Sequence, residues 1–412
     1  MAGSGTVVVA RAPNEVEAIR SSWESFDLPT VHHDLDFFLA KLRTRPTIVR
    51  PHVLLLEDRG RPAALAIGRL EDGTLACNLG YRTVYRPTVR LLVMRPGFLL
   101  QSDPEGSSRT LVAELLASLA SAEADAVSFY GLGDDSHLHR AVTQLPSSLC
   151  RSRFVTHEPH WRLELPESLD AFLASRSRHA RGELRAVDHR LARKYGSRMS
   201  MRLFDSINEV DRLFADLDRV AATTYQRALD VAFADTQEHR ETIALALRCG
   251  WFRAYVLYLD GEPIAYRSGF LYRGTFSGSE TGFDPAFASD RVGTYLLVRL
   301  IDDLCRNHAA QVIDFGCGQG EQKRRFSTSG PEEVHPLVFA PTFTGLRVNL
   351  ARTAIAAADE LGQRALERTG LAVAVKKRWR PAGTRRQAEP TRGDATTGAR
   401  SGRPHGDSDA SN

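Results

Sequence analysis

Hydrophobic and polar positions follow two different periods along the chain. Apolar residues recur every three or four positions, which predicts helices, in residues 15–26, 34–45, 111–120, 170–195, 210–225, 292–307 and 345–380. Short apolar runs bounded by turn residues predict strands at residues 52–57, 63–69, 89–95, 126–130, 161–165, 252–259, 264–271, 275–281 and 311–315. The alternation of these elements predicts an α/β protein in which helices cover mixed, mostly antiparallel sheets.

The length of the chain predicts more than one domain, because 412 residues exceed what one ordinary core accommodates. We expect an N-terminal domain over residues 1–165, closed by the strand at residues 161–165. A second domain over residues 166–340 and a helical segment over residues 341–380 follow. Residues 381–412 are rich in Gly, Ser, Thr, Pro and Arg, which predicts a disordered basic tail.

The positive charge of the chain is concentrated at its end. The formal net charge is +4, and residues 376–412 hold nine Lys or Arg against four Asp or Glu. Removing that excess of five leaves a net charge of −1 for residues 1–375. A nearly neutral body argues against a nucleic-acid partner.

The cysteine pattern and the absence of long apolar runs favour a cytoplasmic protein. The five cysteines stand far apart and form no CxxC pair, which argues against both a disulfide framework and a zinc knuckle. No run of about 18 uncharged apolar residues is present, so we expect no membrane-spanning helix. The first ten residues lack the basic start of a signal peptide.

Several motifs stand in a specific order in the second half. They are VLYLDGEPIA at residues 256–265, GFDP at 282–285, Gly293, DFGCG at 314–318 and KRRF at 323–326. Together with the order helix, helix, three-stranded meander, turn, helix and strand, they resemble the CelD-like (BioF2-like) acetyltransferases. These are relatives of the FemAB-type aminoacyltransferases within the GNAT superfamily. The resemblance is strongest over residues 170–330.

The resemblance implies two tandem GNAT-like modules and the transfer of an acyl group to an amine. The donor in such proteins is usually a coenzyme A thioester, here most simply acetyl-CoA, and no metal is required. The acceptor amine would belong to an amino sugar or to a cell-envelope or polysaccharide precursor.

Residues at the start of the predicted helix 292–307 are the candidates for donor binding. Arg291, Gly293 and Thr294 stand where exposed backbone N–H groups at a helix N-terminus bind phosphate, and glycine permits close approach. Tyr295 occupies the place where the family pattern has a second small residue. The alternative is an ordinary helix start with no ligand.

Three charged residues are the candidates for catalysis. Lys323 follows the last core strand, where a fixed cation stabilises a developing oxyanion, and the FemAB resemblance has a functional lysine in a similar position. Asp314 and Glu280 lie at the ends of neighbouring strands and are candidates to deprotonate the acceptor amine. We expect a raised pKa for a carboxylate in such an apolar strand. The alternatives are a solvated Lys323 and a structural Asp314.

Other polar clusters have weaker interpretations. Arg178, Arg181 and Arg185 lie on the basic helix and are candidates to bind phosphates of a substrate, although a solvated helix face is the simpler interpretation. Residues 134–139 and 157–160 mix His with acidic residues at no known metal spacing, so we expect no metal. The basic, Trp-containing stretch 376–380 suggests peripheral contact with an anionic membrane, or packing on the body.

Two other functions stay open at this stage. The run DFGCGQG at residues 314–320 matches the first motif of an S-adenosylmethionine-dependent methyltransferase, although no long helix follows it. The imperfect donor loop around Gly293 would also suit a non-catalytic double-GNAT scaffold in polysaccharide assembly.

Overall fold

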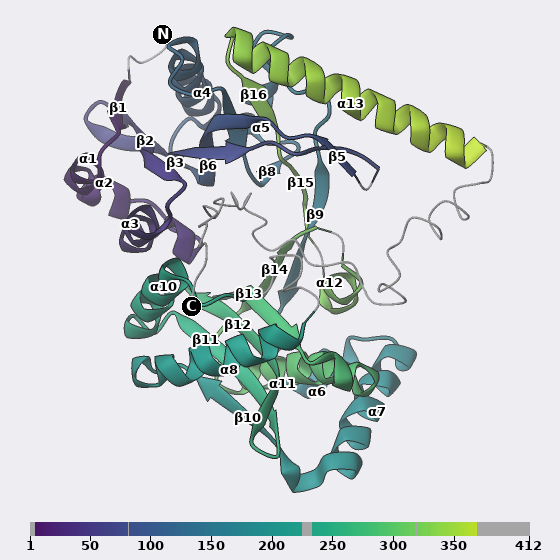
Figure 1. Ribbon diagram of the computed structural model, residues 1–412. Helices are drawn as coiled ribbons and strands as arrows, with labels where there is room; N and C mark the ends of the chain where they lie inside the picture. Colours follow the sequence, from purple (N-terminus) through teal and green to yellow (C-terminus); the bar gives the residue numbers. More distant parts are fainter. Residues whose placement is uncertain (1–4, 81, 225–232, 319, 329, 369–412) are drawn as a thin grey trace, which may run out of the picture.

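The fold consists of two large sheets with helices on their faces, and the second sheet extends from its own half of the molecule into the first half (Figure 1). A computed structural model describes residues 5–80, 82–224, 233–318, 320–328 and 330–368. None of the helices in this part of the chain is long and apolar enough to cross a bilayer.

The first sheet has six strands in the order β1-β2-β3-β6-β7-β16. Their bounds are Thr6–Ala10 (β1), Ile48–Asp58 (β2), Arg61–Thr74 (β3), Thr88–Leu100 (β6), Ala126–Phe129 (β7) and Leu337–Phe339 (β16). A separate hairpin joins β4 (Cys77–Leu79) and β5 (Arg82–Tyr85). The helices of this half are α1 (Pro13–Ala18), α2 (Arg20–Glu24), η1 (Val31–His33), α3 (Leu35–Thr44), α4 (Pro104–Ala120), α5 (His137–Gln144) and α13 (Phe343–Arg368).

The second sheet has eight strands in the order β10-β11-β12-β13-β14-β9-β15-β8. Their bounds are Met199–Phe204 (β10), Phe252–Leu259 (β11), Glu262–Tyr272 (β12), Thr275–Phe283 (β13), Val312–Cys317 (β14), His157–Glu164 (β9), Glu332–Val334 (β15) and Leu132–Gly133 (β8). The helices here are α6 (Leu169–Ala174), α7 (Arg178–Tyr195), η2 (Gly196–Arg198), η3 (Ile207–Glu209), α8 (Val210–Thr223), α10 (Gln237–Arg248), η4 (Pro285–Asp290), α11 (Val292–Arg306) and α12 (Glu321–Phe326).

The two sheets repeat one topology. In the first sheet every neighbouring pair is antiparallel except β6 and β7, which are parallel. The strands β10, β11, β12, β13, β14 and β9 repeat this pattern, with β13 and β14 as the parallel pair. The expected architecture of two tandem modules, each a mixed sheet flanked by helices, is therefore confirmed.

Each module completes its sheet with a strand that follows the other module in the chain. Strand β9 comes directly after the first module, yet it pairs with β14 of the second sheet. Strand β16 follows the second module and pairs with β7 of the first sheet. The expectation that the strand near residue 161 closes the first module is therefore wrong. Backbone N–H and C=O groups at the inner edge of each sheet need partners, and the two modules supply these to one another.

Three large hydrophobic cores and one smaller cluster around Val89 and Phe339 fill the layers of the described part of the molecule. One lies between the first sheet and α4 and α5, and another between the second sheet and α6, α7 and α11. The third is shared, because α1, α2 and α3 of the first module join α8 and α10 of the second in one cluster. Trp23 and Tyr266, from opposite modules, are both fully buried in it.

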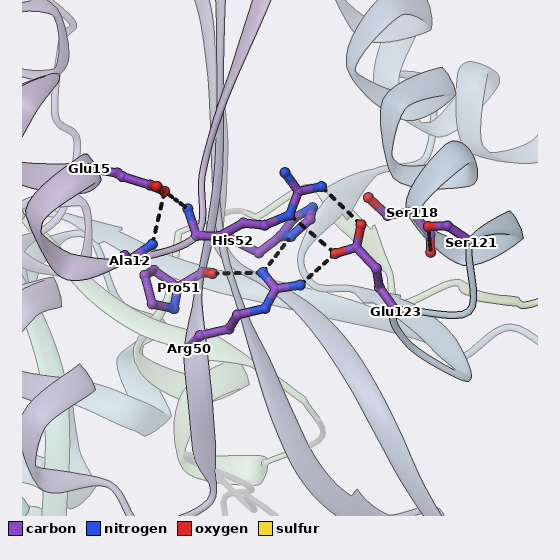
Figure 2. A network of polar contacts seen from close by, with 9 residues as sticks. Ala12, Glu15, Arg50, Pro51, His52, Ser118, Ser121 and Glu123 are labelled. Atoms are coloured by element: carbon purple, nitrogen blue, oxygen red, sulfur yellow. Dashed lines mark hydrogen bonds and ion pairs between the residues drawn. The ribbon is translucent and has the colours of Figure 1, made fainter.

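A polar network ties the start of the first module to the turn after α4 (Figure 2). The carboxylate of Glu123 accepts hydrogen bonds from Arg11 at 2.9 Å and from Arg50 at 2.5 Å. His52 is fully buried beside it, and its Nδ1 accepts from Arg50 at 3.2 Å. Burial lowers the pKa of His52 to about 4, so the ring is neutral. This network fastens the chain leading from β1, together with β2, to the end of α4.

Most elements expected from the sequence are present, and two of the expected helices are each divided in two. The segment 15–26 divides at Ile19 into α1 and α2, and the segment 170–195 divides before Ser177, which caps α7. The elements that were not expected are the helices α5 and α10 and the strands β1, β4, β5, β8, β10, β15 and β16. The ends of the helices expected at 210–225 and 345–380, the basic stretch 376–380 and the predicted disordered tail 381–412 lie outside the described residues.

The strand exchange predicts that β16 stabilises the first module. Val338 is only 2% exposed on β16 and lies opposite Val127 of β7. Replacing Val338 by Asp puts a carboxylate into that core, and we expect a loss of roughly 3 kcal/mol or more in unfolding free energy. Denaturant unfolding measures it. Val84→Asp, at a 52% exposed position of β5, is the control and should have little effect. Equal midpoints for the two variants would contradict the assignment of β16.

Candidate functional site

Strands β13 and β14 pair over only three residues and then separate. Their parallel register joins Thr275, Phe276 and Ser277 to the start of β14, whereas β13 continues to Phe283. A bulge shifts the register of β13 against β12 between Arg267 and Gly269, at the level where β13 leaves β14. Beyond these three residues, the backbone groups of the two central strands do not pair with one another.

The N-terminus of α11 lies beside the far end of β13. Arg291 precedes it in a left-handed conformation, φ 60°, and no side chain caps the helix. A side chain at Gly293 would first meet Phe283 of β13, at 3.6 Å, so the backbone there is open. The amide of Thr294, in the first turn, bonds back to the Arg291 carbonyl at 3.0 Å. The corresponding helix of the first module differs, because Asp103 caps α4 by accepting from the Gly106 amide at 3.0 Å.

Ion pairs fix α7 against the start of α11 and against α12. Glu183 of α7 accepts from Arg291 at 3.3 Å and from Arg325 of α12 at 2.5 Å. Asp290, buried just before α11, accepts from Lys194 and Tyr195, both at 2.7 Å. The hydrogen bond from Lys194 lowers the pKa of Asp290. The loop before α11 is therefore held by charged groups of α7.

The three arginines expected to bind phosphate lie elsewhere on α7. Helical geometry turns Arg178, Arg181 and Arg185 to the side opposite Glu183, which faces α11 and α12. Arg178 and Arg185 are exposed and Arg181 is half-buried. They are not brought together with Arg291, Gly293 and Thr294, and their role stays a prediction.

Asp314 takes part in a buried ionic clasp. Its Oδ1 lies 2.7 Å from Nε2 of His160 on β9, and the other ring nitrogen, Nδ1, lies 2.7 Å from Oε1 of Glu333 on β15. Burial alone would lower the pKa of His160, but the bonds and charges of both carboxylates raise it to about 9. The imidazole is therefore protonated at neutral pH and holds β14, β9 and β15 together.

The expected raised pKa of Asp314 is wrong. Burial does act in that direction, but the hydrogen bond and charge of His160 outweigh it. The Gly316 amide, which donates to Oδ1 at 2.7 Å, and Arg162 add to the effect, so the net shift of the Asp314 pKa is downward. A carboxylate that is ionised and paired in this way is a poor acceptor for a substrate proton. Asp314 is better explained as a positioning group for the turn after β14.

Lys323 is buried, contrary to the solvated alternative. It is 7% exposed, and its ammonium donates to the carbonyl of Cys317 at 2.7 Å. Burial lowers its pKa, although nearby acidic groups, Asp314 among them, partly oppose that effect. The turn between β14 and α12 thus brings Lys323 and Asp314 together. Glu280 lies in the part of β13 beyond the separation. Burial raises the pKa of Tyr266, and the nearby charge of Glu280 raises it further.

One group of side chains has metal-ligand character. Atoms of Glu158, Cys317 and His335 lie within 4.8 Å of one another. However, Nδ1 of His335 accepts a bond from the Gly131 amide at 3.0 Å, so the ring proton sits on Nε2. Burial also raises the pKa of the Cys317 thiol. A metal requires an unprotonated ring nitrogen and a thiolate, so this donor set does not fit a resident metal ion.

Several residues of the site have no signal in the sequence. His160 and Glu333 reach Asp314 only through the exchanged strand β9 and the short strand β15. Glu183 is one of two acids on a basic helix, and Arg267 is the single cation in a mostly apolar strand. Only a prediction that β9 lies beside β14 could have found the clasp, and the sequence places β9 next to the first module.

Comparison with known proteins defines the class of the second module. Residues 178–324 match the family model of the acetyltransferase (GNAT) domain, so the second module is a GNAT acetyltransferase domain and the chain is an acyltransferase. No curated protein matches the chain.

Solved structures agree with this fold at low sequence identity. FemX is 10% identical with a TM-score of 0.51, over 78% of this chain and 95% of FemX. A tandem GNAT protein from the clavulanic acid biosynthesis pathway is 13% identical with a TM-score of 0.49, over 82% and 99% of the two chains. The C-terminal domain of a putative lysylphosphatidylglycerol synthetase from Agrobacterium fabrum has 12% identity and a TM-score of 0.47, over 84% and 97%. The likeness to FemX shows a shared fold.

The methyltransferase interpretation of the DFGCGQG run is wrong. A Rossmann domain needs a parallel sheet and a long helix after this turn. In the described part of the second sheet, β13 and β14 are the parallel pair and all other pairs are antiparallel. Helix α12, which follows the turn, has only six residues.

The clasp predicts a pH dependence of stability. Because the fold raises the pKa of His160, the protonated ring stabilises the fold fully at any pH below 6.5, the ordinary pKa of histidine. This contribution is lost as the pH rises through about 9. The Tm difference between the protein and its His160→Gln variant should therefore shrink between pH 6.5 and 9.5. His157→Gln, at an exposed position on the same strand, is the control. A constant Tm difference across this range would show that His160 is neutral in the fold.

Proposed function

We propose that the second module transfers an acyl group from a coenzyme A thioester to an amine. The observation that carries the proposal is the separation of β13 from β14 next to the uncapped N-terminus of α11. An extended thioester arm can bond to the free edge of β13, while the first turn of α11 receives the diphosphate. Arg291, Gly293 and Thr294 would hold that end of acetyl-CoA or a longer acyl-CoA.

The donor binds in one module only. In the first module, Asp103 and Glu105 place two carboxylates at the start of α4, and Asp103 already accepts from the Gly106 amide. These charges repel phosphate and occupy an amide that would bind it. The first module therefore acts as a structural partner that supplies β9 to the second sheet.

The proposed reaction needs a cation and a proton acceptor. The amine nitrogen attacks the thioester carbonyl, the C–N bond forms, and the C–S bond breaks as coenzyme A leaves. Lys323 stabilises the oxyanion, because its buried ammonium uses one of its three N–H groups on Cys317. Glu280, on the part of β13 beyond the separation, takes the amine proton. The departing sulfur takes a proton from solvent.

The acceptor class rests on the resemblance to CelD-like and FemAB-type proteins. An amine on an amino sugar or on a cell-envelope or polysaccharide precursor is the substrate that this resemblance favours. We place the protein in the cytoplasm, where acyl-CoA is available. A peripheral membrane contact would fit such a precursor, and nucleic acid is not a proposed partner because residues 1–375 carry a net charge of only −1.

Substitution of Gly293 tests the donor site. A side chain there meets only Phe283 at ordinary contact distance, so Gly293→Val should fold normally by circular dichroism. The added methyl groups fill the approach to the helix start, and acyl-CoA affinity measured by calorimetry should fall at least about tenfold. An unchanged affinity in the folded variant would remove the donor from this site.

Substitution of Lys323 tests the chemistry. Lys323→Met keeps the buried volume and removes the charge, so kcat should fall by about 10² to 10³ with little change in the KM for the donor. Release of the coenzyme A thiol, with the best acceptor from an amine panel, measures both constants. Lys323→Arg should not restore kcat, because the planar guanidinium places its donors differently. A raised KM with normal kcat would make Lys323 a phosphate ligand. An absence of thiol release from every pair would favour the scaffold alternative.

A further inference from the structure

Helix α12 is surrounded by cations that no described carboxylate pairs with. Lys323 bonds only to the Cys317 carbonyl. Arg176 donates to the carbonyls of Arg325 and Ser327 at 3.5 and 3.2 Å, while its Nε and Nη2 are buried without partners. Arg267 of β12 donates to Oε1 of Gln322 at 3.1 Å, and its Nε is buried without a partner.

Arg267 is the least compensated of these cations. Burial alone lowers its pKa to about 10, so the fold disfavours its charge, and no acid in the described part of the chain offsets that effect. Two other half-buried arginines of the same module do have acids: Arg253 lies 3.4 Å from Asp303, and Arg299 bonds to Asp188. An unpaired charge that is taken out of water is retained at a cost in stability, so it indicates a partner outside the described residues of the chain.

The position of Arg267 identifies where that partner lies. Arg267 stands opposite Thr281 of β13, next to the bulge at which β13 parts from β14. Its guanidinium reaches α12, which follows β14, so it borders the separation of the two strands. Part of the residue is accessible although protein surrounds it, as is typical of a group in the wall of a deep site.

We propose that a carboxylate or phosphate of the substrate binds Arg267 beside the reacting atoms. This inference rests on the proposed acyl transfer and narrows its substrates. The anion belongs either to the acyl group, as in the monothioester of a dicarboxylic acid, or to an acceptor amine that also bears a carboxylate. The guanidinium fork suits two parallel bonds to such a group, with Lys323 as a second cation nearby.

The stability of the ligand-free protein gives the first arm of the test. Arg267→Met removes an unpaired charge and keeps the volume, so Tm should stay the same or rise. Arg253→Met, the matched control on the neighbouring strand, removes a paired charge and should lower Tm. A lower Tm for Arg267→Met than for Arg253→Met would show that Arg267 is paired within the protein, and would overturn the inference.

Calorimetry gives the second arm, with ligands that differ in one charge. If the acyl group carries the anion, succinyl-CoA should bind at least about tenfold tighter than butyryl-CoA, and Arg267→Met should remove that difference. If the acceptor carries the anion, the protein saturated with coenzyme A should bind glycine more tightly than glycinamide. Arg267→Met should remove that preference as well. The same preference should survive in Arg253→Met.

The outcomes separate this inference from the proposed function. Free coenzyme A should bind equally to the protein and to Arg267→Met. If Arg267→Met weakens the binding of free coenzyme A as much as that of succinyl-CoA, Arg267 binds the phosphates of the donor instead. If the protein shows no preference within either ligand pair, the inference is overturned and the proposed acyl transfer is unaffected. If no form of coenzyme A binds, the proposed function fails, and the glycine pair measured alone still decides whether Arg267 takes an anion.

Discussion

The inner edge of each sheet has to be paired, and this constraint determines the architecture of the protein. A parallel strand, β7 in one module and β14 in the other, would end its sheet with an unpaired row of backbone groups inside the molecule. Each is covered by the strand that follows the opposite module. Because the covering strands cross between modules, the shared core around Trp23 and Tyr266 forms as a consequence, and neither module has a complete sheet by itself.

The same exchange builds the polar part of the site. His160 arrives on β9 and Glu333 on β15, and both meet Asp314 at the end of β14. The clasp fixes the turn from which Lys323 projects, since Asp314 also accepts from the Gly316 amide. The two modules have diverged at the matching helix starts. In one, Asp103 closes α4, whereas in the other Arg291 leaves α11 open. The two modules thus share one topology and differ in the charge and capping at this helix start.

The sequence predicted those features whose causes are local. Helix α3 follows from Asp34 as its cap and from apolar residues at helical spacing, and the meander β11–β13 follows from its two Gly-containing turns. Lys323 was singled out because a motif places it after the last core strand, and its catalytic role stays a prediction. The exchange of β9 could not be predicted, because it depends on contacts such as His160 with Asp314, which are 154 residues apart. The pKa of Asp314 was misjudged for the same reason, since its burial was foreseeable and its partner was not.

The unmatched cations also bear on how an amine could react at this site. An amine must lose its proton before it attacks a thioester, and at neutral pH most free amines are protonated. Neighbouring positive charge lowers the pKa of a bound ammonium, so Lys323 and Arg267 favour the neutral, nucleophilic form. The nearby carboxylate of Asp314 would oppose this effect, but its negative charge is balanced by the protonated ring of His160. An anion of the substrate seated on Arg267 would leave Lys323 as the cation nearest the carbonyl, and that ammonium would then stabilise the oxyanion while Glu280 removes the proton.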